Sequence, residues 1–81
     1  MKNMIISALL DKRSEHAPEF QEILTRHGCI INVRLGVHEV QGCVNQGLIL
    51  LLVNGENNEI EALLKDLKNY PNVRVNAMDV R

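Results

Sequence analysis

His38 and Cys43 are the residues of this 81-residue chain best suited to chemistry, because they stand five positions apart and carry ligand atoms that nickel, copper and zinc prefer. His16 would join them if its loop lies at the same end of the fold. Two or three scattered ligands do not complete a site within one chain. A metal site on His38, Cys43 and His16 is therefore the alternative interpretation, and a solvated histidine with a buried thiol is the leading one.

The same pair does not indicate an enzyme. Cys43 would act as a nucleophile only with a base such as His38 and an oxyanion hole at a helix N-terminus, and nothing in the spacing requires either. No glycine-rich phosphate loop follows a strand, and Glu59 and Glu61 are typical first-turn helix charges. We therefore expect no catalytic residues, and the sequence indicates no particular cofactor.

The two cysteines, Cys29 and Cys43, flank a predicted strand and stand on the order of 30 Å apart at about 3.3 Å per residue. They can neither form an intrachain disulfide nor share one intrachain metal. The start of the chain, Met1–Ser7, has only a short apolar run and no small-residue cleavage pattern. Thiols without an export signal are typical of a reducing compartment, which predicts a cytoplasmic protein.

The stretch around which the fold is organised is Leu48–Val53, six successive apolar residues between Gly47 and Asn54–Gly55. It falls far short of the roughly 20 residues that span a bilayer, so we expect no membrane insertion. It also lacks a polar face at a period of two, which predicts a central strand buried on both faces. Lys2–Leu10 is apolar on both faces apart from Ser7 and predicts a second central strand.

Two further strands are predicted to be half exposed. From residue 31 the sequence alternates with a period of two, which places on one face Ile31, Val33, Leu35 and Val37. The other face carries Arg34 as its one cation, either an ordinary solubilising charge or a contact with a carboxylate or with an interface. Residues 73–77 alternate in the same way. Both patterns are typical of edge strands.

Two amphipathic helices connect these strands. The first begins between Ser14 as N-cap and Pro18 in the first turn, and Gly28 ends it. Its apolar stripe consists of Ala17, Phe20, Ile23, Leu24 and the boundary residue His27. The second begins with a capping box over Asn58–Glu61 and ends before Tyr70–Pro71. Its apolar stripe consists of Ile60, Leu63, Leu64 and Leu67.

The order strand, helix, strand, strand, helix, strand is that of a ferredoxin-like α+β sandwich. Right-handed crossovers give an antiparallel sheet in the order 4-1-3-2 with both helices on one face, and we expect a single such domain over residues 1–81. The uncovered face exposes an apolar patch larger than monomers usually tolerate, which predicts a homodimer or higher oligomer. The predicted interface residues are Leu48, Leu50, Leu52 and, on the edge strand, Arg34.

The charge balance argues against nucleic acid as a partner. The formal net charge is −1, and only Phe20 and Tyr70 are aromatic. No basic field is available to neutralise a phosphate backbone, and few rings could stack on bases. We therefore expect no nucleic-acid binding by this chain alone.

Four segments resemble a known family of small proteins, the iron-only hydrogenase system regulators: Val33–Val37, Gly47–Val53, Asn57–Leu63 and Leu67–Asn76. The match covers most of the chain. Those proteins are stand-alone ACT-like domains, related in fold to the ligand-binding half of nickel-responsive repressors. The resemblance therefore implies an ACT-like fold and a regulatory role, and its motifs bear on architecture more than on activity.

The resemblance also implies a place for a ligand. ACT-like domains bind small effectors between subunits near the loop from the first strand to the first helix, which corresponds here to Asp11, Lys12, Arg13 and Ser14. The residues suit an anion, because a helix N-terminus offers unpaired N–H groups, Lys12 and Arg13 add charge, and His38 closes the same end. The alternative is a solvated turn.

These observations predict a non-enzymatic regulatory module that binds a small molecule or a protein partner as a homo-oligomer, in hydrogenase regulation if the resemblance holds. Two alternatives stay open. One is a sensor or carrier of nickel, zinc or copper that uses His38 and Cys43. The other is a purely structural oligomerisation domain.

Overall fold

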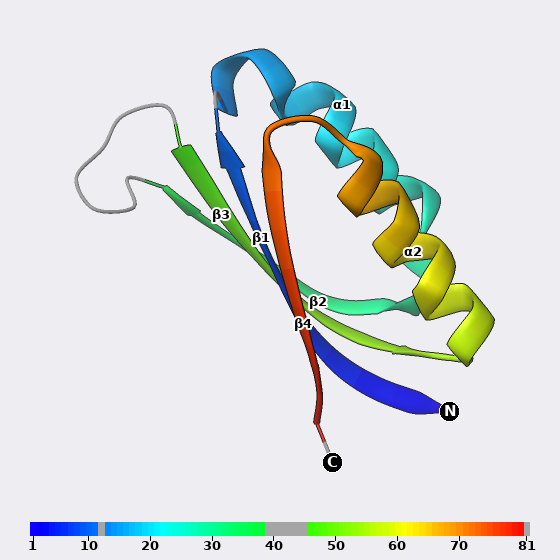
Figure 1. The fold of residues 1–81 in the computed structure, drawn as a ribbon. Helices are drawn as coiled ribbons and strands as arrows, with labels where there is room; N and C mark the ends of the chain where they lie inside the picture. The colour runs from blue at the N-terminus through cyan, green and yellow to red at the C-terminus, as the bar shows by residue number, and fades with distance from the viewer. Residues whose placement is uncertain (12, 39–45, 81) are drawn as a thin grey trace.

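The computed structural model describes residues 1–11, 13–38 and 46–80, without the side chains of residues 13–17, 38 and 46. Four strands, two α-helices and one 3₁₀ helix follow one another along the chain (Figure 1). They are β1 (Lys2–Asp11), α1 (Arg13–Arg26), η1 (Gly28–Ile30), β2 (Ile31–His38), β3 (Gln46–Gly55), α2 (Asn57–Asn69) and β4 (Val73–Asp79).

The four strands form one antiparallel sheet in the order β2-β3-β1-β4, which is the predicted order 4-1-3-2 counted from the other edge. Both helices lie across the same face of this sheet (Figure 1). The predicted ferredoxin-like α+β fold is therefore confirmed, with the two doubly apolar strands, β1 and β3, in the middle. Within the described residues, no helix is both long enough and apolar enough to cross a membrane.

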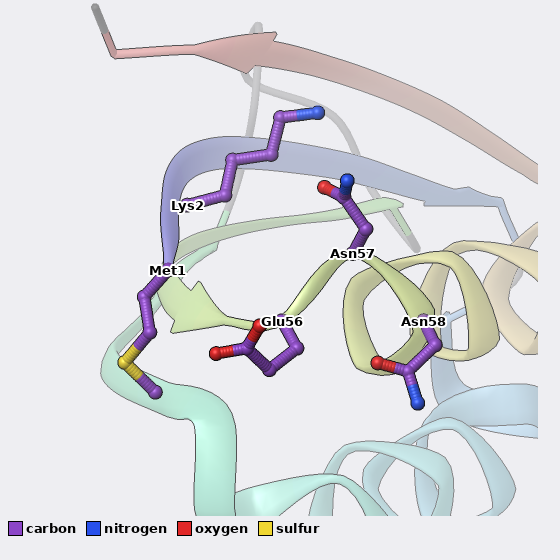
Figure 2. A pocket seen from close by; sticks show the side chains of 5 residues that line it. All are labelled: Met1, Lys2, Glu56, Asn57 and Asn58. Atoms are coloured by element: carbon purple, nitrogen blue, oxygen red, sulfur yellow. The ribbon is translucent and has the colours of Figure 1, made fainter.

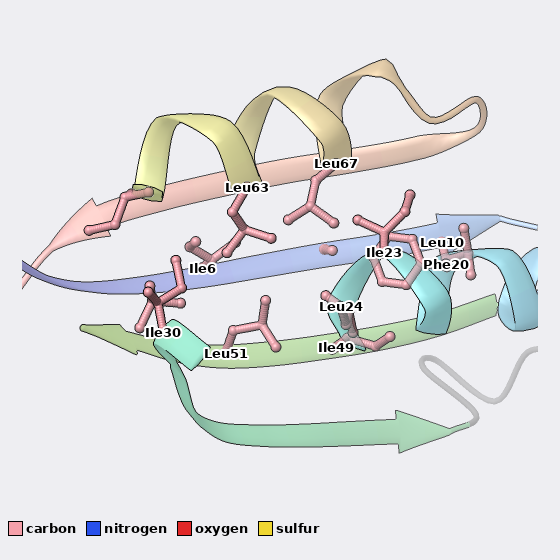
Figure 3. Close-up of a cluster of buried hydrophobic side chains, with 13 residues drawn as sticks. Ile6, Leu10, Phe20, Ile23, Leu24, Ile30, Ile49, Leu51, Leu63 and Leu67 are labelled. Atoms are coloured by element: carbon pink, nitrogen blue, oxygen red, sulfur yellow. The ribbon is translucent and has the colours of Figure 1, made fainter. Parts of the chain in front are cut away.

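The hydrophobic core lies between the sheet and the helices (Figure 3). Alternate residues of the central strands enter it, so that Ile6 is fully buried while its neighbour Ile5 is 40% exposed. The helices contribute Phe20, Ile23, Leu24, Ile60, Leu63 and Leu67. Each fully buried side chain of this kind stabilises the fold by about 1.5 to 3 kcal/mol relative to an exposed one.

Helix α1 begins earlier than the sequence predicts. It starts at Arg13, so Pro18 lies inside the helix and not in its first turn. Proline has no N–H to donate to the carbonyl four residues before it, and this costs the helix one hydrogen bond near its start. At the other end the helix stops at Arg26, and Gly28 opens η1, which turns the chain into β2.

Helix α2 is capped two residues before the predicted position. Its N-cap is Glu56, and the side chain of Glu59 accepts a hydrogen bond of 2.9 Å from the backbone N–H of Glu56. The predicted capping box over Asn58–Glu61 is therefore wrong in register. The helix ends at Asn69, before Tyr70, as predicted.

A β-bulge in β2 changes which residues reach the core. The register shifts between Ile31, which pairs with Val53, and Val33, which pairs with Leu52. Ile31 therefore packs against the core, while Val33 and Leu35 lie on the opposite face and are 50% and 52% exposed. The predicted common face for Ile31, Val33, Leu35 and Val37 is wrong, because the extra residue of a bulge reverses the alternation.

Candidate functional site

One feature outside the core is the open face, which we define as the side of the sheet that neither helix covers. The register places Val33, Leu52, Ile5 and Met78 next to one another, in one row across all four strands. Their exposed fractions are 50%, 38%, 40% and 59%. The row is therefore a continuous apolar ridge on the surface of the protein.

Two more rows of the open face follow toward the start of α1. The second row consists of Leu35, Leu50, Ser7 and Asn76, and the third of Val37, Leu48, Leu9 and Arg74. Only Arg74 is charged among the residues of the three rows, and it stands on the edge strand β4. Depletion of charge in the middle with polar residues at the rim is the usual composition of a protein interface.

The residues predicted for an interface divide between the two sides of the sheet. Leu48, Leu50 and Leu52 lie on the open face, on the other side of β3 from the buried Leu51. Arg34 pairs with Leu51 in the register and lies on the helix side, where its guanidinium donates a hydrogen bond to the side-chain carbonyl of Gln21 in α1. Arg34 is therefore at the sheet edge but not on the open face, and the interface role of all four residues stays a prediction.

The residues predicted to bind an effector belong to one end of the sheet. Asp11 pairs with Gln46 and His38 with Gly47, so the ends of β1 and β2 meet the start of β3 (Figure 1). The backbone N–H of Asp11 donates to the carbonyl of Asn72 at 2.9 Å, which attaches this end to the turn before β4.

Helix α1 starts beside Asp11, at Arg13, so the N–H groups of its first turn belong to the same end. Lys12 lies outside the described residues, as do the side chains of Arg13, Ser14 and His38. Effector binding at this end therefore stays a prediction, with a backbone arrangement that is compatible with it.

The metal alternative is not tested by the described residues. Among them, no three His, Cys, Asp or Glu side chains gather to hold a metal ion. Cys43 and the side chains of His16 and His38 fall outside that statement, because they belong to the part of the chain that is not described. Cys29, which was predicted to lie at the other end of the sheet, is an exposed free thiol.

At that opposite end an ion pair joins the two helices. Nε2 of His27 lies 2.7 Å from Oδ2 of Asp66, and the guanidinium of Arg26 lies 3.5 Å from the same oxygen. The hydrogen bond with His27 holds the pKa of the Asp66 carboxyl below its usual value. His27 is half-buried, as predicted for a boundary residue, but its partner, 39 residues away, was not predictable from the sequence.

Two surface hollows lie at this end of the sheet, and one of them includes Arg26 and His27. One, of about 290 Å³, lies between α1 and the start of α2 and is lined by Arg26, His27, Cys29, Ile30, Asn58, Glu59 and Ala62. The other, of about 530 Å³, is lined by Met1, Lys2, Glu56, Asn57 and Asn58 (Figure 2). The Glu56 carboxylate faces the N-terminus of α2 in the second hollow, so that helix end is not an open anion site.

Comparison with known proteins gives structural relatives only. No family model matches the chain, and no curated protein matches it either. An uncharacterised protein from Thermotoga maritima is 24% identical with a TM-score of 0.88, over 99% of this chain and 98% of that one.

A second solved structure is CPII, a nitrogen regulatory PII-like protein from Thiomonas intermedia K12, bound to ADP, AMP and bicarbonate. It is 15% identical with a TM-score of 0.66, over 100% of this chain and 97% of that one. At these identities the likenesses show the ferredoxin-like fold, which occurs in a regulatory protein. The resemblance to hydrogenase system regulators stays a prediction.

Proposed function

We propose that this chain is a single-domain, non-enzymatic regulatory module that works as a homo-oligomer and responds to a small effector. The observation that carries the proposal is the open face, which neither α1 nor α2 covers and where one fully apolar row crosses the sheet beside two mostly apolar ones. Contiguous apolar surface of this extent marks an interaction site in soluble proteins. A second copy of the chain is the simplest partner, because it brings the same surface.

The effector is proposed to bind at the end of the sheet where β1 meets α1. Asp11, Lys12, Arg13, Ser14 and His38 belong to this end by their place in the chain. Lys12 and Arg13 together with the first N–H groups of a helix favour an anionic group. The PII-like neighbour, whose structure holds ADP, AMP and bicarbonate, supports small anions as the first compounds to try.

An NMR titration of the unmodified chain tests the effector. ADP, AMP, bicarbonate and individual amino acids are added separately while the backbone amide shifts are followed. The proposal expects one of them to move amides at Asp11–Ser14 and near His38, with saturation. The shifts should disappear in a Lys12→Ala, Arg13→Ala double variant and persist in a Lys65→Ala, Lys68→Ala control, whose charges lie on α2.

The same titration can reject the proposal. Shifts confined to 54–58 and Cys29 would place the ligand at the wrong end of the sheet. No saturable shift with any compound, in a protein that is nonetheless oligomeric, would favour the purely structural oligomerisation domain. Stoichiometric nickel, zinc or copper in the untagged protein, lost in Cys43→Ser, would favour the metal sensor instead.

The resemblance to hydrogenase system regulators extends the proposal to the process that is regulated. Such a module would act by binding an effector or a protein partner of the hydrogenase system rather than by catalysis. Deleting its gene in its own host should then change hydrogenase activity. An unchanged activity would remove this extension and leave the effector-binding module untouched.

A further inference from the structure

The open face is not flat. Its β2–β3 half carries large side chains, and its β1–β4 half has a hollow. Beside the apolar ridge a hollow of about 150 Å³ lies between β1 and β4, lined by Ile5, Ser7, Asn76, Ala77 and Met78. Leu35 on β2 and Leu50 on β3 stand in the same row as Ser7 and Asn76. Each copy therefore presents large side chains on one half of this row and a hollow on the other half.

Two identical sheets that pack face to face are related by a two-fold axis in the plane between them, either parallel to the strands or across them. A parallel axis between β3 and β1 lays β2 over the partner's β4 and β3 over the partner's β1. Each row then meets itself in reverse order. Leu35 faces Asn76 of the partner subunit, and Leu50 faces the partner's Ser7.

In this arrangement large side chains meet small ones. Leu35 and Leu50 of each copy enter the other's hollow, and along the ridge Val33 faces Met78 of the partner subunit while Leu52 faces the partner's Ile5. An axis across the strands at the second row would instead put Ser7 and Asn76 over themselves, leaving two hollows face to face. Arg74 of the partner subunit faces an apolar residue about either axis, Val37 about the parallel one and Met78 about the one across the strands. The hollows therefore decide between the two axes, because voids weaken an interface.

The open face is large enough for a small interface between two copies. Over the seven residues of the shortest strand, β4, four strands about 4.8 Å apart with about 3.3 Å per residue make a face of roughly 19 by 23 Å in plan. Side chains that stand up from the sheet raise its accessible area toward the about 800 Å² per partner of a standard interface. We infer that the open face binds a second copy of this chain about a two-fold axis parallel to the strands, with Leu35 and Leu50 of each copy filling the hollow at Ser7 and Asn76 of the other.

This inference rests on the homo-oligomer of the proposed function, and a double-mutant cycle on Leu35 and Asn76 tests it separately. These residues lie on opposite edge strands, three strand spacings or about 14 Å apart within one chain. Mutations at that distance without shared partners have additive effects on free energy. Coupling between them in the dimer dissociation constant can therefore come only from contact across the interface.

The single variants Leu35→Asn and Asn76→Leu should each raise the dissociation constant about tenfold or more, the first by lost apolar burial and the second by overpacking. The double variant should return to within about threefold of the unmodified chain, because it exchanges the large and small partners. Thr25→Leu, an exposed position on α1, is the control for an added leucine and should leave the constant unchanged. Sedimentation equilibrium over a concentration series measures the dissociation constants of the unmodified chain and of the four variants.

Each contrary result overturns a different statement. A dimer in which the double variant is as weak as the product of the two single effects would contradict the parallel axis alone. A tighter dimer in Asn76→Leu would indicate the axis across the strands, where residue 76 faces itself. An unmodified chain that stays monomeric at all concentrations would overturn this inference together with the assembly in the proposed function.

Discussion

Nε2 of His27, at the end of α1, lies 2.7 Å from Oδ2 of Asp66 in the last turn of α2, and Arg26 approaches the same carboxylate oxygen. Both helices also contribute apolar side chains to the core above the sheet (Figure 3). This hydrogen bond is therefore a polar link between helices that are far apart in the sequence.

The link predicts how stability depends on pH. The folded-state pKa of Asp66 is lowered by its hydrogen bond with His27 and by the nearby charges of His27, Arg26 and Lys65. A lowered carboxyl pKa stabilises the folded state above the unfolded pKa, and this contribution is lost as pH falls through the folded pKa. Asp66→Asn should therefore lower the free energy of unfolding at pH 7 and have a smaller effect below about pH 3.5.

Urea denaturation of both proteins across that pH range measures the difference. The variant Glu61→Gln is a control for removing one carboxylate charge at an exposed position of α2. A constant difference between Asp66→Asn and the unmodified protein from pH 7 to pH 3 would contradict the account.

A second prediction concerns the ionisation of Tyr70, the only tyrosine in the chain. Its hydroxyl donates to Oε2 of Glu19 at 3.0 Å, and its ring packs edge-on against Phe20 with 6.0 Å between centroids. Burial and the Glu19 carboxylate both raise the pKa of Tyr70 above its usual value of 10. Absorbance at the phenolate band, in a chain without tryptophan, should show ionisation above pH 10.

Replacing Glu19 by Gln should lower this pKa, because the repulsion between carboxylate and phenolate is removed while the ring stays packed. Folded stability should also fall as pH rises above 10, since a raised pKa favours the protonated folded state. An identical titration curve in Glu19→Gln would mean that the hydrogen bond does not hold in solution.

Replacing Gly55 and Gly36 by alanine should have opposite effects on stability. A Cβ at Gly55 would lie 2.9 Å from Cγ2 of Ile30 and 3.3 Å from Oε1 of Glu59, while a Cβ at Gly36 would meet nothing within 4 Å. Gly55→Ala should therefore cost about 1 to 3 kcal/mol of folding free energy by overpacking. Gly36→Ala should be neutral or slightly stabilising, because alanine loses less conformational freedom in a strand. Equal thermal midpoints for the two variants would contradict the packing around Ile30.

The sheet was predictable from the sequence because two segments, Lys2–Leu10 and Leu48–Val53, are apolar on both faces. Such strands belong in the two central positions of a four-stranded sheet, and right-handed crossovers then give the strand order. The prediction that both faces of Leu48–Val53 are buried does not hold within one chain, because Leu52 lies on the open face and is 38% exposed. The bulge in β2 was not predictable, since the alternation from Ile31 to Val37 is unbroken and only the register with β3 reveals the extra residue.

The ends of a helix were predictable only where one residue type determines them. Tyr70–Pro71 ends α2 because proline cannot continue a helix. The start of α2 was not predictable, because Glu56 is not a preferred N-cap residue and Asn58 is. The pairing of His27 with Asp66 was missed because each is an ordinary polar residue in its own helix. The effector site at Asp11–Ser14 and His38 was predicted from the resemblance to ACT-like domains, and it stays a prediction.

The mass of the folded protein in solution tests the central claim most directly. Sedimentation equilibrium of the unmodified chain should give at least twice the mass of one chain. Leu50→Glu, on the open face, should give a folded monomer with an unchanged circular dichroism spectrum, while Thr25→Glu on α1 should keep the full mass. Leu51→Glu, at a core position 2% exposed, should instead unfold the chain. A monomeric unmodified protein, or a Leu50→Glu variant that keeps the full mass, would contradict assembly through the open face.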